Sequence, residues 1–186
     1  MKPTGTLQLR PGAVERGFTL IELMVTVLIG AILIAIAIPA FNTFILNDRD
    51  IAEINSLVAS FNYARSEAVK RDSANGIIVC PSSNGLICSG TSAWSGGWIV
   101  SDSNPADAPL QAVPALAGSN TLTATGAGAA GISFLSGGTV NGAVTIQICD
   151  TRGAAYARDV EVNQTGRVAA SQTPGKSVSG APLACP

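Results

Sequence analysis

A single acidic residue, Glu22, lies in an otherwise uncharged apolar stretch from Phe18 to Ile38. As an α-helix, these 21 residues would extend about 30 Å, which is the thickness of the hydrocarbon core of a bilayer. A carboxylate in lipid costs about 2 kcal/mol or more unless a partner neutralises it. The stretch therefore predicts a membrane-spanning helix in which Glu22 has a functional role.

The segment before this helix is basic, because it carries Lys2, Arg10 and Arg16 against one acid, Glu15. A positive flank holds the N-terminus of a span in the cytoplasm, so the rest of the chain is expected on the outer side of the membrane. The apolar run continues into a helix-like segment instead of ending at the small-residue cleavage site of a secretory signal. On these features alone, the segment is an uncleaved signal anchor.

The residues GFTLIE, from Gly17 to Glu22, resemble the class III signal of type IV pilins and type II secretion pseudopilins. The resemblance implies that a prepilin peptidase cuts between Gly17 and Phe18, and that Phe18 is then N-methylated. It also implies that Glu22 is a subunit-assembly residue that faces the amine of a neighbouring subunit. Pro39 matches a proline that is common in the long helix of this family, where we expect a helix break.

The pairing of Glu22 with an amine has a physical reason of its own. A lone carboxylate and a lone ammonium are both costly in hydrocarbon, and two subunits offset along the helix axis could bring one to the other. Assembly would then relieve a buried charge and set the register of a filament. The alternative is a simple anchor with an accidental acid.

A second segment narrows the family. Residues 62–71 read NYARSEAVKR, which is similar to a signature of the GspH/FimT family of minor pilins and minor pseudopilins. Cys80, Trp94, residues 97–100 and residues 166–168 recur in the order that this family shows. The resemblance implies an α+β type IV pilin fold, with a long N-terminal helix packed on a mainly antiparallel sheet.

The sequence pattern after Pro39 agrees with that fold. Apolar residues at steps of three or four indicate an amphipathic helix, in which Glu67 and Arg71 form a favourable pair and Asn75-Gly76 supplies a stop. The expected apolar stripe is Ile51, Ile54, Val58, Phe61, Ala64 and Ala68, with Asp48, Glu53, Arg65 and Lys70 on the solvated face.

Short runs rich in Val, Ile and Trp, separated by turn formers, predict one antiparallel sheet. Asn141-Gly142 and residues 164–166 look like hairpin turns, and the Ala/Gly/Ser/Thr-rich segment 103–131 is expected to be a long loop. The predicted strands are 77–80, 98–101, 132–135, 144–149, 159–163 and 167–170. The expected domains are a cleaved leader (1–17), a transmembrane and assembly helix (18–44), an amphipathic half-helix (45–73) and a β-rich domain (74–186).

Four cysteines lie beyond the span, and an even number in an exported domain favours disulfides. Three pairings are possible. We expect Cys80 with Cys88 and Cys149 with Cys185, because each bond would close an otherwise loop-rich segment, the second stabilising the domain by about 2 to 4 kcal/mol. A zinc site is disfavoured, because the chain has no Cys-x-x-Cys pair and no histidine.

An enzyme is not expected, and neither is a cofactor or a metal. Without histidine, a Ser or Cys nucleophile lacks its usual base, and no phosphate loop is present. Trp94 and Trp98 flank a glycine pair and could stack on a ligand, but most such residues belong to a core.

DNA binding is the remaining candidate for a ligand-binding function. FimT-like proteins bind DNA in natural transformation through a GRxR-like motif, but the matching residues 166–169 read GRVA, without the second arginine. The whole chain has a net charge of −1, whereas salt-dependent DNA affinity needs several clustered cations. The candidate DNA contacts are Arg152, Arg158, Arg167 and Lys176.

The resemblance therefore implies a minor type IV pilin of the FimU/FimT type that acts in the priming or tip complex and in pilus assembly. Its expected partners are other pilins, the prepilin peptidase and the bacterial inner membrane, with the C-terminal domain in the periplasm and later at the filament tip. The alternatives are a GspH-type minor pseudopilin of type II secretion and, thirdly, a DNA-binding pilin.

Overall fold

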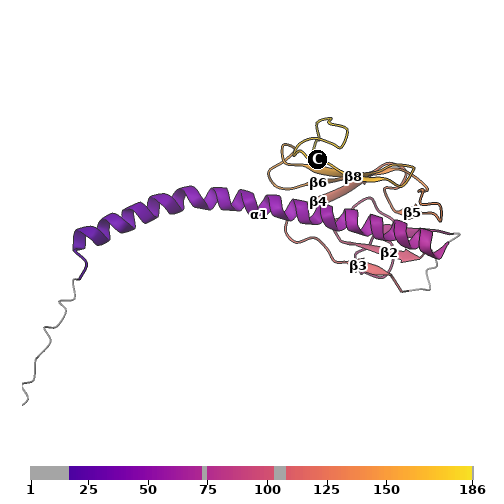
Figure 1. Cartoon of the computed structure of the whole chain (residues 1–186), viewed down its shortest axis with the longest axis horizontal. Helices are drawn as coiled ribbons and strands as arrows, with labels where there is room; N and C mark the ends of the chain where they lie inside the picture. Colours follow the sequence, from indigo (N-terminus) through magenta and orange to yellow (C-terminus); the bar gives the residue numbers. More distant parts are fainter. Residues whose placement is uncertain (1–16, 73–74, 103–107, 186) are drawn as a thin grey trace, which may run out of the picture. The chain divides into compact units, whose positions relative to one another are not determined.

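The computed structural model describes residues 17–72, 75–102 and 108–185, so Lys2, Arg10 and Arg16 of the expected leader lie outside the described residues. The chain divides into one compact unit that ends at Thr43 and another that runs from Phe44 onward. Helix α1 (Leu20–Arg71) contributes to both units, and the strands follow it in the second (Figure 1). They are β1 (Ile77–Pro81), β2 (Trp98–Asp102), β3 (Gln111–Val113), β4 (Thr121–Thr125), β5 (Ile132–Phe134), β6 (Val144–Cys149), β7 (Arg158–Val162) and β8 (Val168–Ala170).

The first unit exposes its apolar side chains. Phe18 is 82% exposed and Leu20 77%. In the described residues, α1 is the helix that is long and apolar enough to cross a membrane; its most apolar window has a mean hydropathy of 2.8, and none of that window is buried. These side chains need an apolar environment that the chain does not itself supply.

The helix break expected at Pro39 does not occur, because Pro39 lies inside α1 and the helix continues to Arg71. A proline removes one donor from the backbone ladder and crowds the preceding turn. The next turn is supported by Thr43, whose hydroxyl donates a hydrogen bond to the Pro39 carbonyl at 3.2 Å.

In the second unit, α1 packs on the strands through a stripe that differs in part from the expected one. Ile51, which was expected in the stripe, is 41% exposed, whereas Leu57 is fully buried. Glu53, which was expected on the solvated face, is only 8% exposed. The buried apolar residues of the helix are Ile54, Leu57, Phe61, Ala64 and Ala68.

The end of the helix is close to the expected one. Arg71 Nε donates to Glu67 Oε2 at 2.7 Å, which confirms the predicted pair. The helix ends at Arg71, and Asp72 follows in the left-handed region with φ 47°, so the chain turns before it reaches Asn75.

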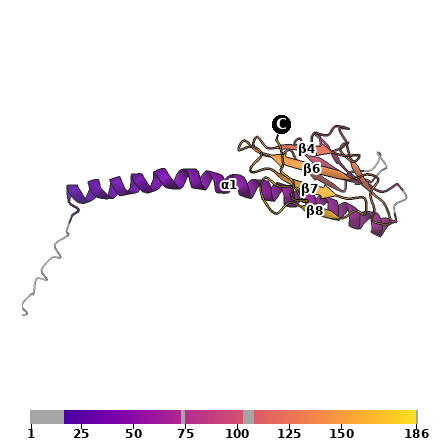
Figure 2. The same cartoon turned by 90° about the horizontal axis from the view of Figure 1, so that it is seen from above.

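The strands form two antiparallel four-stranded sheets, where one sheet was expected. The orders are β3-β2-β1-β5 and β4-β6-β7-β8. Figure 2 shows the second sheet, with β4, β6, β7 and β8 side by side in this order. Phe61 of α1, Val79 of β1 and Ile146 of β6 belong to the same buried cluster. The two sheets and the second half of α1 thus share one core.

The segment 103–131, which was expected to be a loop, contains β3 and β4. In β4, Leu122 and Ala124 are buried, while Thr121, Thr123 and Thr125 are exposed. The prediction failed because it rested on the composition of the whole segment, whereas the threonines of β4 favour a strand and alternate with buried residues. Pairing with β6 stabilises this strand. Residues 103–107 of the segment lie outside the described part.

Of the two predicted hairpin turns, one is confirmed. Residues 164–166 join β7 to β8, and the Asn163 amide donates to the Arg167 carbonyl at 3.1 Å. Gly166 has φ 73°, and a Cβ there would collide with the Gly138 carbonyl oxygen. Asn141-Gly142 is not a hairpin turn, because β5 pairs with β1 and not with β6.

Trp94 and Trp98 are both fully buried, which confirms the core interpretation. Trp98 Nε1 donates to the Ser60 hydroxyl at 3.0 Å, and Trp94 Nε1 donates to the Ala129 carbonyl at 2.9 Å. Each indole thus satisfies its polar atom inside the core.

Candidate functional site

The predicted assembly residues lie at the first turn of α1. The helix begins at Leu20, so Thr19 is the N-cap residue and Glu22 the third residue of the helix. The Glu22 amide donates to Thr19 Oγ1 at 3.3 Å, which is half of a capping box. An acid in the first turn also complements the positive end of the helix dipole. Glu22 therefore stabilises its own helix start, a role that the sequence analysis did not assign to it.

The carboxylate of Glu22 is exposed, as are Gly17 and Phe18. Among the residues that the structure describes, no Lys or Arg forms an ion pair with Glu22. The start of α1 thus exposes an apolar side chain, Phe18, close to two polar ones, Thr19 and Glu22.

The cysteines form two disulfides in the second unit. Cys80 is bonded to Cys88 with a Cα–Cα distance of 5.5 Å, and Cys149 to Cys185 with 5.9 Å. These are the expected pairs. The first closes the start of the β1–β2 connection, and the second fixes the C-terminal tail to the end of β6.

Arg152, one of the four candidate DNA contacts, points into the protein. Its Nη2 lies 2.8 Å from Asp50 Oδ2, and its Nε pairs with Asp150. Its Nη1 donates to Asn47 Oδ1 at 2.7 Å, and the guanidinium stacks 4.1 Å from the ring centre of Tyr156. The interpretation of Arg152 as a phosphate contact is corrected, because two carboxylates already neutralise a side chain that is 13% exposed.

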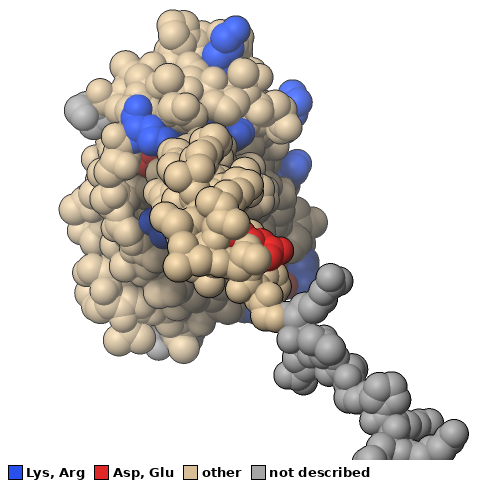
Figure 3. All heavy atoms as spheres, turned by 90° about the vertical axis from the view of Figure 1, so that its left-hand side faces the viewer, with Lys and Arg blue, Asp and Glu red and all other residues tan. Residues whose placement is uncertain are grey.

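The other three candidates differ in their exposure. Arg158 is half-buried and donates to the carbonyls of Ser171 and Gln172 at 3.4 Å, while Arg167 and Lys176 are exposed. On the face seen in Figure 3, uncharged residues separate the Lys and Arg side chains from one another. A binding stripe for phosphates needs cations side by side.

Comparison with known proteins decides the family. Residues 53–166, more than half of the chain, match the model of the type II transport protein GspH. The chain belongs to the GspH family. Residues 13–38 match a second model, the prokaryotic N-terminal methylation motif. The family consists of pilin-like structural proteins, and no curated protein matches this GspH-family chain.

Two crystal structures of the type IV minor pilin FimU from Pseudomonas aeruginosa are similar to this GspH-family protein. Their TM-scores are 0.53 and 0.52, with 24% and 25% sequence identity. The alignments cover 73% and 70% of this chain and 98% of each FimU chain. The protein therefore has the type IV pilin fold, as expected.

The GspH-family domain also buries a polar cluster that the sequence analysis missed. Asn120 Nδ2 donates to Asp50 Oδ1 at 2.9 Å and to Glu53 Oε2 at 2.8 Å. Burial raises the pKa of Asp50, an effect to which the charge of Asp150 adds and which Arg152 opposes. Burial also raises the pKa of Glu53, against the hydrogen bond from Asn120. The cluster joins α1 to the start of β4 and to the turn after β6.

A signal for this cluster was present in the helix pattern. Asp50 stands four residues before Ile54 and is therefore in phase with the buried stripe of α1, where an acid needs a partner. Its partners Asn120 and Arg152 are 70 and 102 residues away, so the pairing itself required the structure.

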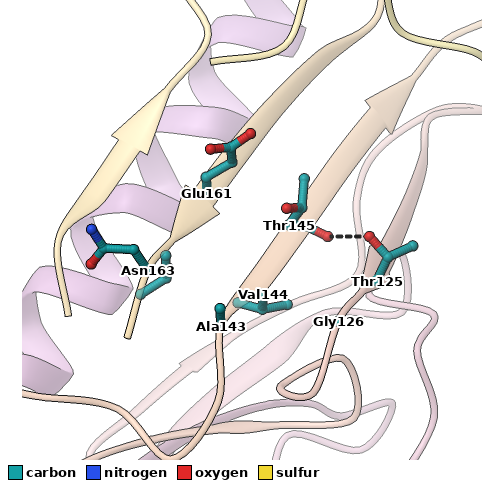
Figure 4. Close-up of a pocket in the computed structure, with 8 residues that line it drawn as sticks. Thr125, Gly126, Ala143, Val144, Thr145, Glu161 and Asn163 are labelled. Atoms are coloured by element: carbon teal, nitrogen blue, oxygen red, sulfur yellow. Dashed lines mark hydrogen bonds between the residues drawn. The ribbon is translucent and has the colours of Figure 1, made fainter. Parts of the chain in front are cut away.

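An open hollow of about 230 Å³ lies on the sheet formed by β4, β6 and β7 (Figure 4). Thr125 Oγ1 donates to the Thr145 carbonyl at 3.5 Å, and Glu161 and Asn163 stand on the far side. Among the described residues that line it, Glu161 is the one titratable group. Glu161 lies directly opposite Thr145 in the pairing of β6 with β7.

Proposed function

We propose that this GspH-family protein is a minor type IV pilin of the FimU/FimT type, which acts in the priming or tip complex and helps to start pilus assembly. The observation that supports this role is the combination of two matches in one chain. The N-terminal methylation motif covers residues 13–38, and the fold that follows corresponds to 98% of the FimU chain.

In this proposal a prepilin peptidase removes residues 1–17 by cutting between Gly17 and Phe18, and Phe18 is N-methylated. Residues 18–44 are the transmembrane and assembly helix, residues 45–73 are its amphipathic continuation, and residues 74–186 are the β-rich domain. The protein first spans the inner membrane once, with its C-terminal domain in the periplasm, and then moves to the filament tip. The exposed apolar side chains of the first unit suit both lipid and the interior of a filament.

Glu22 is the proposed recruitment residue. Its carboxylate faces a cost of about 2 kcal/mol or more in hydrocarbon, which the N-terminal amine of a neighbouring pilin would offset. Because Thr19 and Glu22 share the first turn, the cap fixes the backbone position from which the carboxylate reaches out. The proposed partners are other pilins, with the prepilin peptidase as a transient one.

A second candidate is the minor pseudopilin of a type II secretion system. The family model that matches residues 53–166 is itself described as a type II transport protein, which favours this alternative. Both candidates use the same processing and the same helix, so they differ in the filament that takes up the subunit.

Deletion of the gene separates the two candidates. We expect loss of surface pili and of twitching motility, with secretion of enzymes unchanged, and expression of the intact chain should restore both. Loss of secretion with normal pili would exclude the pilus assignment and favour the pseudopilin.

A further inference from the structure

The connection between β1 and β2 presents two aliphatic side chains to solvent. Leu86 is 66% exposed and Ile87 62%, and they are neighbours in the chain. We name this pair the apolar tip. Single exposed apolar residues need no explanation, so the interest of this pair lies in how its loop is held and in what surrounds it.

The loop that carries the apolar tip is held by several bonds. The Asn84 side chain accepts hydrogen bonds from the amides of Leu86 and Ile87, at 2.9 and 3.1 Å. Ser82 Oγ accepts one from the Gly85 amide at 3.1 Å, and the Cys80–Cys88 disulfide closes the loop at its base. The tip is therefore pre-organised, so docking it would cost little conformational entropy.

The surroundings of the tip indicate the chemistry of its partner. The sequence has no charged residue from Gly76 to Ser101. The same uncharged surface continues into a hollow of about 320 Å³ beside the loop, whose lining combines Ser82, Ser83 and Asn84 with glycine and apolar residues. A charged group would lose its hydration here without gaining a counter-charge, so the surface favours an uncharged partner, and the two aliphatic side chains favour an apolar contact.

The size of the tip indicates how the partner is held. Two aliphatic side chains bury far less than the roughly 1,200 Å² of total surface at which stable interfaces begin. The contact can contribute only if something else keeps the two molecules together, since a tethered contact gains a high effective concentration. In this chain α1 supplies that tether when it is packed with the helix of a neighbour.

We infer that the apolar tip inserts into an uncharged apolar hollow on the globular domain of a neighbouring pilin-like subunit, and that this contact selects the neighbour within the assembly. The inference rests on the proposed function, because it requires a co-assembled neighbour. The helices provide the attachment, and the tip provides a specific lateral contact.

The first test is photocrosslinking in the native cell. The full chain carries a photoreactive benzoylphenylalanine in place of Ile87, and a second version carries it in place of Val69, an exposed aliphatic residue on α1. We expect position 87 to crosslink to a protein that itself has the N-terminal methylation motif, at several times the yield from position 69. Adducts with lipid alone, with proteins that lack the motif, or no adduct would overturn the inference.

The second test is a double substitution, Leu86→Ser with Ile87→Ser, in the full chain, with Val69→Ser as the matched control. We expect about tenfold fewer filaments from the double variant and unchanged numbers from the control, because two buried aliphatic contacts are lost. Intact disulfides and unchanged protease resistance would show that the fold is kept. Asn84→Ala, which frees the loop but leaves the tip, should give a severalfold reduction.

A parallel Glu22→Ala variant separates the two proposals. If Glu22→Ala abolishes filaments while the tip variant assembles normally, the inference about the tip is wrong and the proposed function stands. If deletion of the whole gene leaves pili and secretion intact, the proposed function fails, and the tip inference fails with it.

Discussion

Helix α1 carries one carboxylate without an internal partner in the first unit and one with internal partners in the second. In the first unit, Glu22 stands among exposed apolar residues and forms no ion pair with a described residue. In the second, Asp50 is 2% exposed and is held by Arg152 and Asn120. Both acids leave bulk water in the proposed assembly, but the partner of Asp50 comes from the same chain. The partner of Glu22 is expected from another subunit. Charge pairing thus holds the fold of the second unit together, and in the proposed assembly it would join the first unit to a neighbouring subunit.

The largest loss of stability is expected from removing Arg152, the internal partner of Asp50. Arg152→Ala would leave Asp50 and Asp150 buried without a counter-charge, which costs about 3 to 5 kcal/mol. Urea unfolding of the full chain in detergent, followed by the fluorescence of Trp94 and Trp98, measures the loss. Arg158→Ala, which removes only long hydrogen bonds to carbonyls, should cost less than about 1 kcal/mol. Equal losses in the two variants would mean that the buried cluster has no special role.

Removing Glu22, whose expected partner lies in another subunit, should leave the fold unchanged and reduce assembly. Glu22→Ala is expected to leave leader cleavage intact and to reduce incorporation into filaments roughly 30-fold, if the full cost of a buried charge is at stake. Immunoblots of processed protein and of sheared filaments give the two quantities. Thr19→Ala, which removes the cap but keeps the acid, should have the smaller effect, and Gly17→Ala should block cleavage itself. Normal incorporation of the Glu22 variant would contradict the pairing with an amine.

The internal acids also predict the direction of a pH dependence. Burial raises the pKa of Asp50, Glu53 and Asp159, so above about pH 4 the folded chain holds more protons on these carboxyls than the unfolded chain. Stability should therefore fall as the pH rises through their raised pKa values. Asp159 has one buried oxygen without a hydrogen bond, and Asp159→Asn should flatten the decline. Asp48→Asn, at an exposed position, is the control; an identical slope in the Asp159 variant would refute the assignment.

The smallest effect is expected from replacing Arg167, an exposed cation, in a DNA-binding assay. Duplex DNA mixed with the full chain in detergent at low salt should show no mobility shift, and Arg167→Ala should change nothing. Arg152 is engaged internally, which leaves Arg167 and Lys176 as the exposed members of the candidate set. A shift that disappears at high salt and in the Arg167 variant would restore the DNA-binding hypothesis.

The sequence predicted those parts of the structure that depend on local pattern. The long helix, the Glu67–Arg71 pair and most strands follow from spacing and from β-branched residues. Strand β4 was missed because the surrounding segment is rich in Ala, Gly and Ser, although the alternation and the threonines of β4 itself favour a strand. Its partner β6 lies about 20 residues further along the chain. The division into two sheets was missed because it depends on which distant strands pair, such as β1 with β5, and a local pattern does not show that.

The candidate site divides in the same way. Gly17, Phe18 and Glu22 were named from a contiguous motif, and their roles stay predictions, whereas the expected cysteine pairs are present as disulfides. The cluster around Asp50 could not, because its members Asn120 and Arg152 meet it only through tertiary packing. The phase of Asp50 within the helical stripe shows that a partner must exist, but not which residue it is.

The turn between β7 and β8 bears on how short motifs should be interpreted. Gly166 has a left-handed backbone and no room for a Cβ against the Gly138 carbonyl, so this position accepts glycine whether or not a ligand is ever bound. The glycine at the start of a GRxR-like match is therefore required here by the close approach of two backbone segments. In any chain with this turn, only the two arginine positions can inform on nucleic acid, and here one of them is alanine.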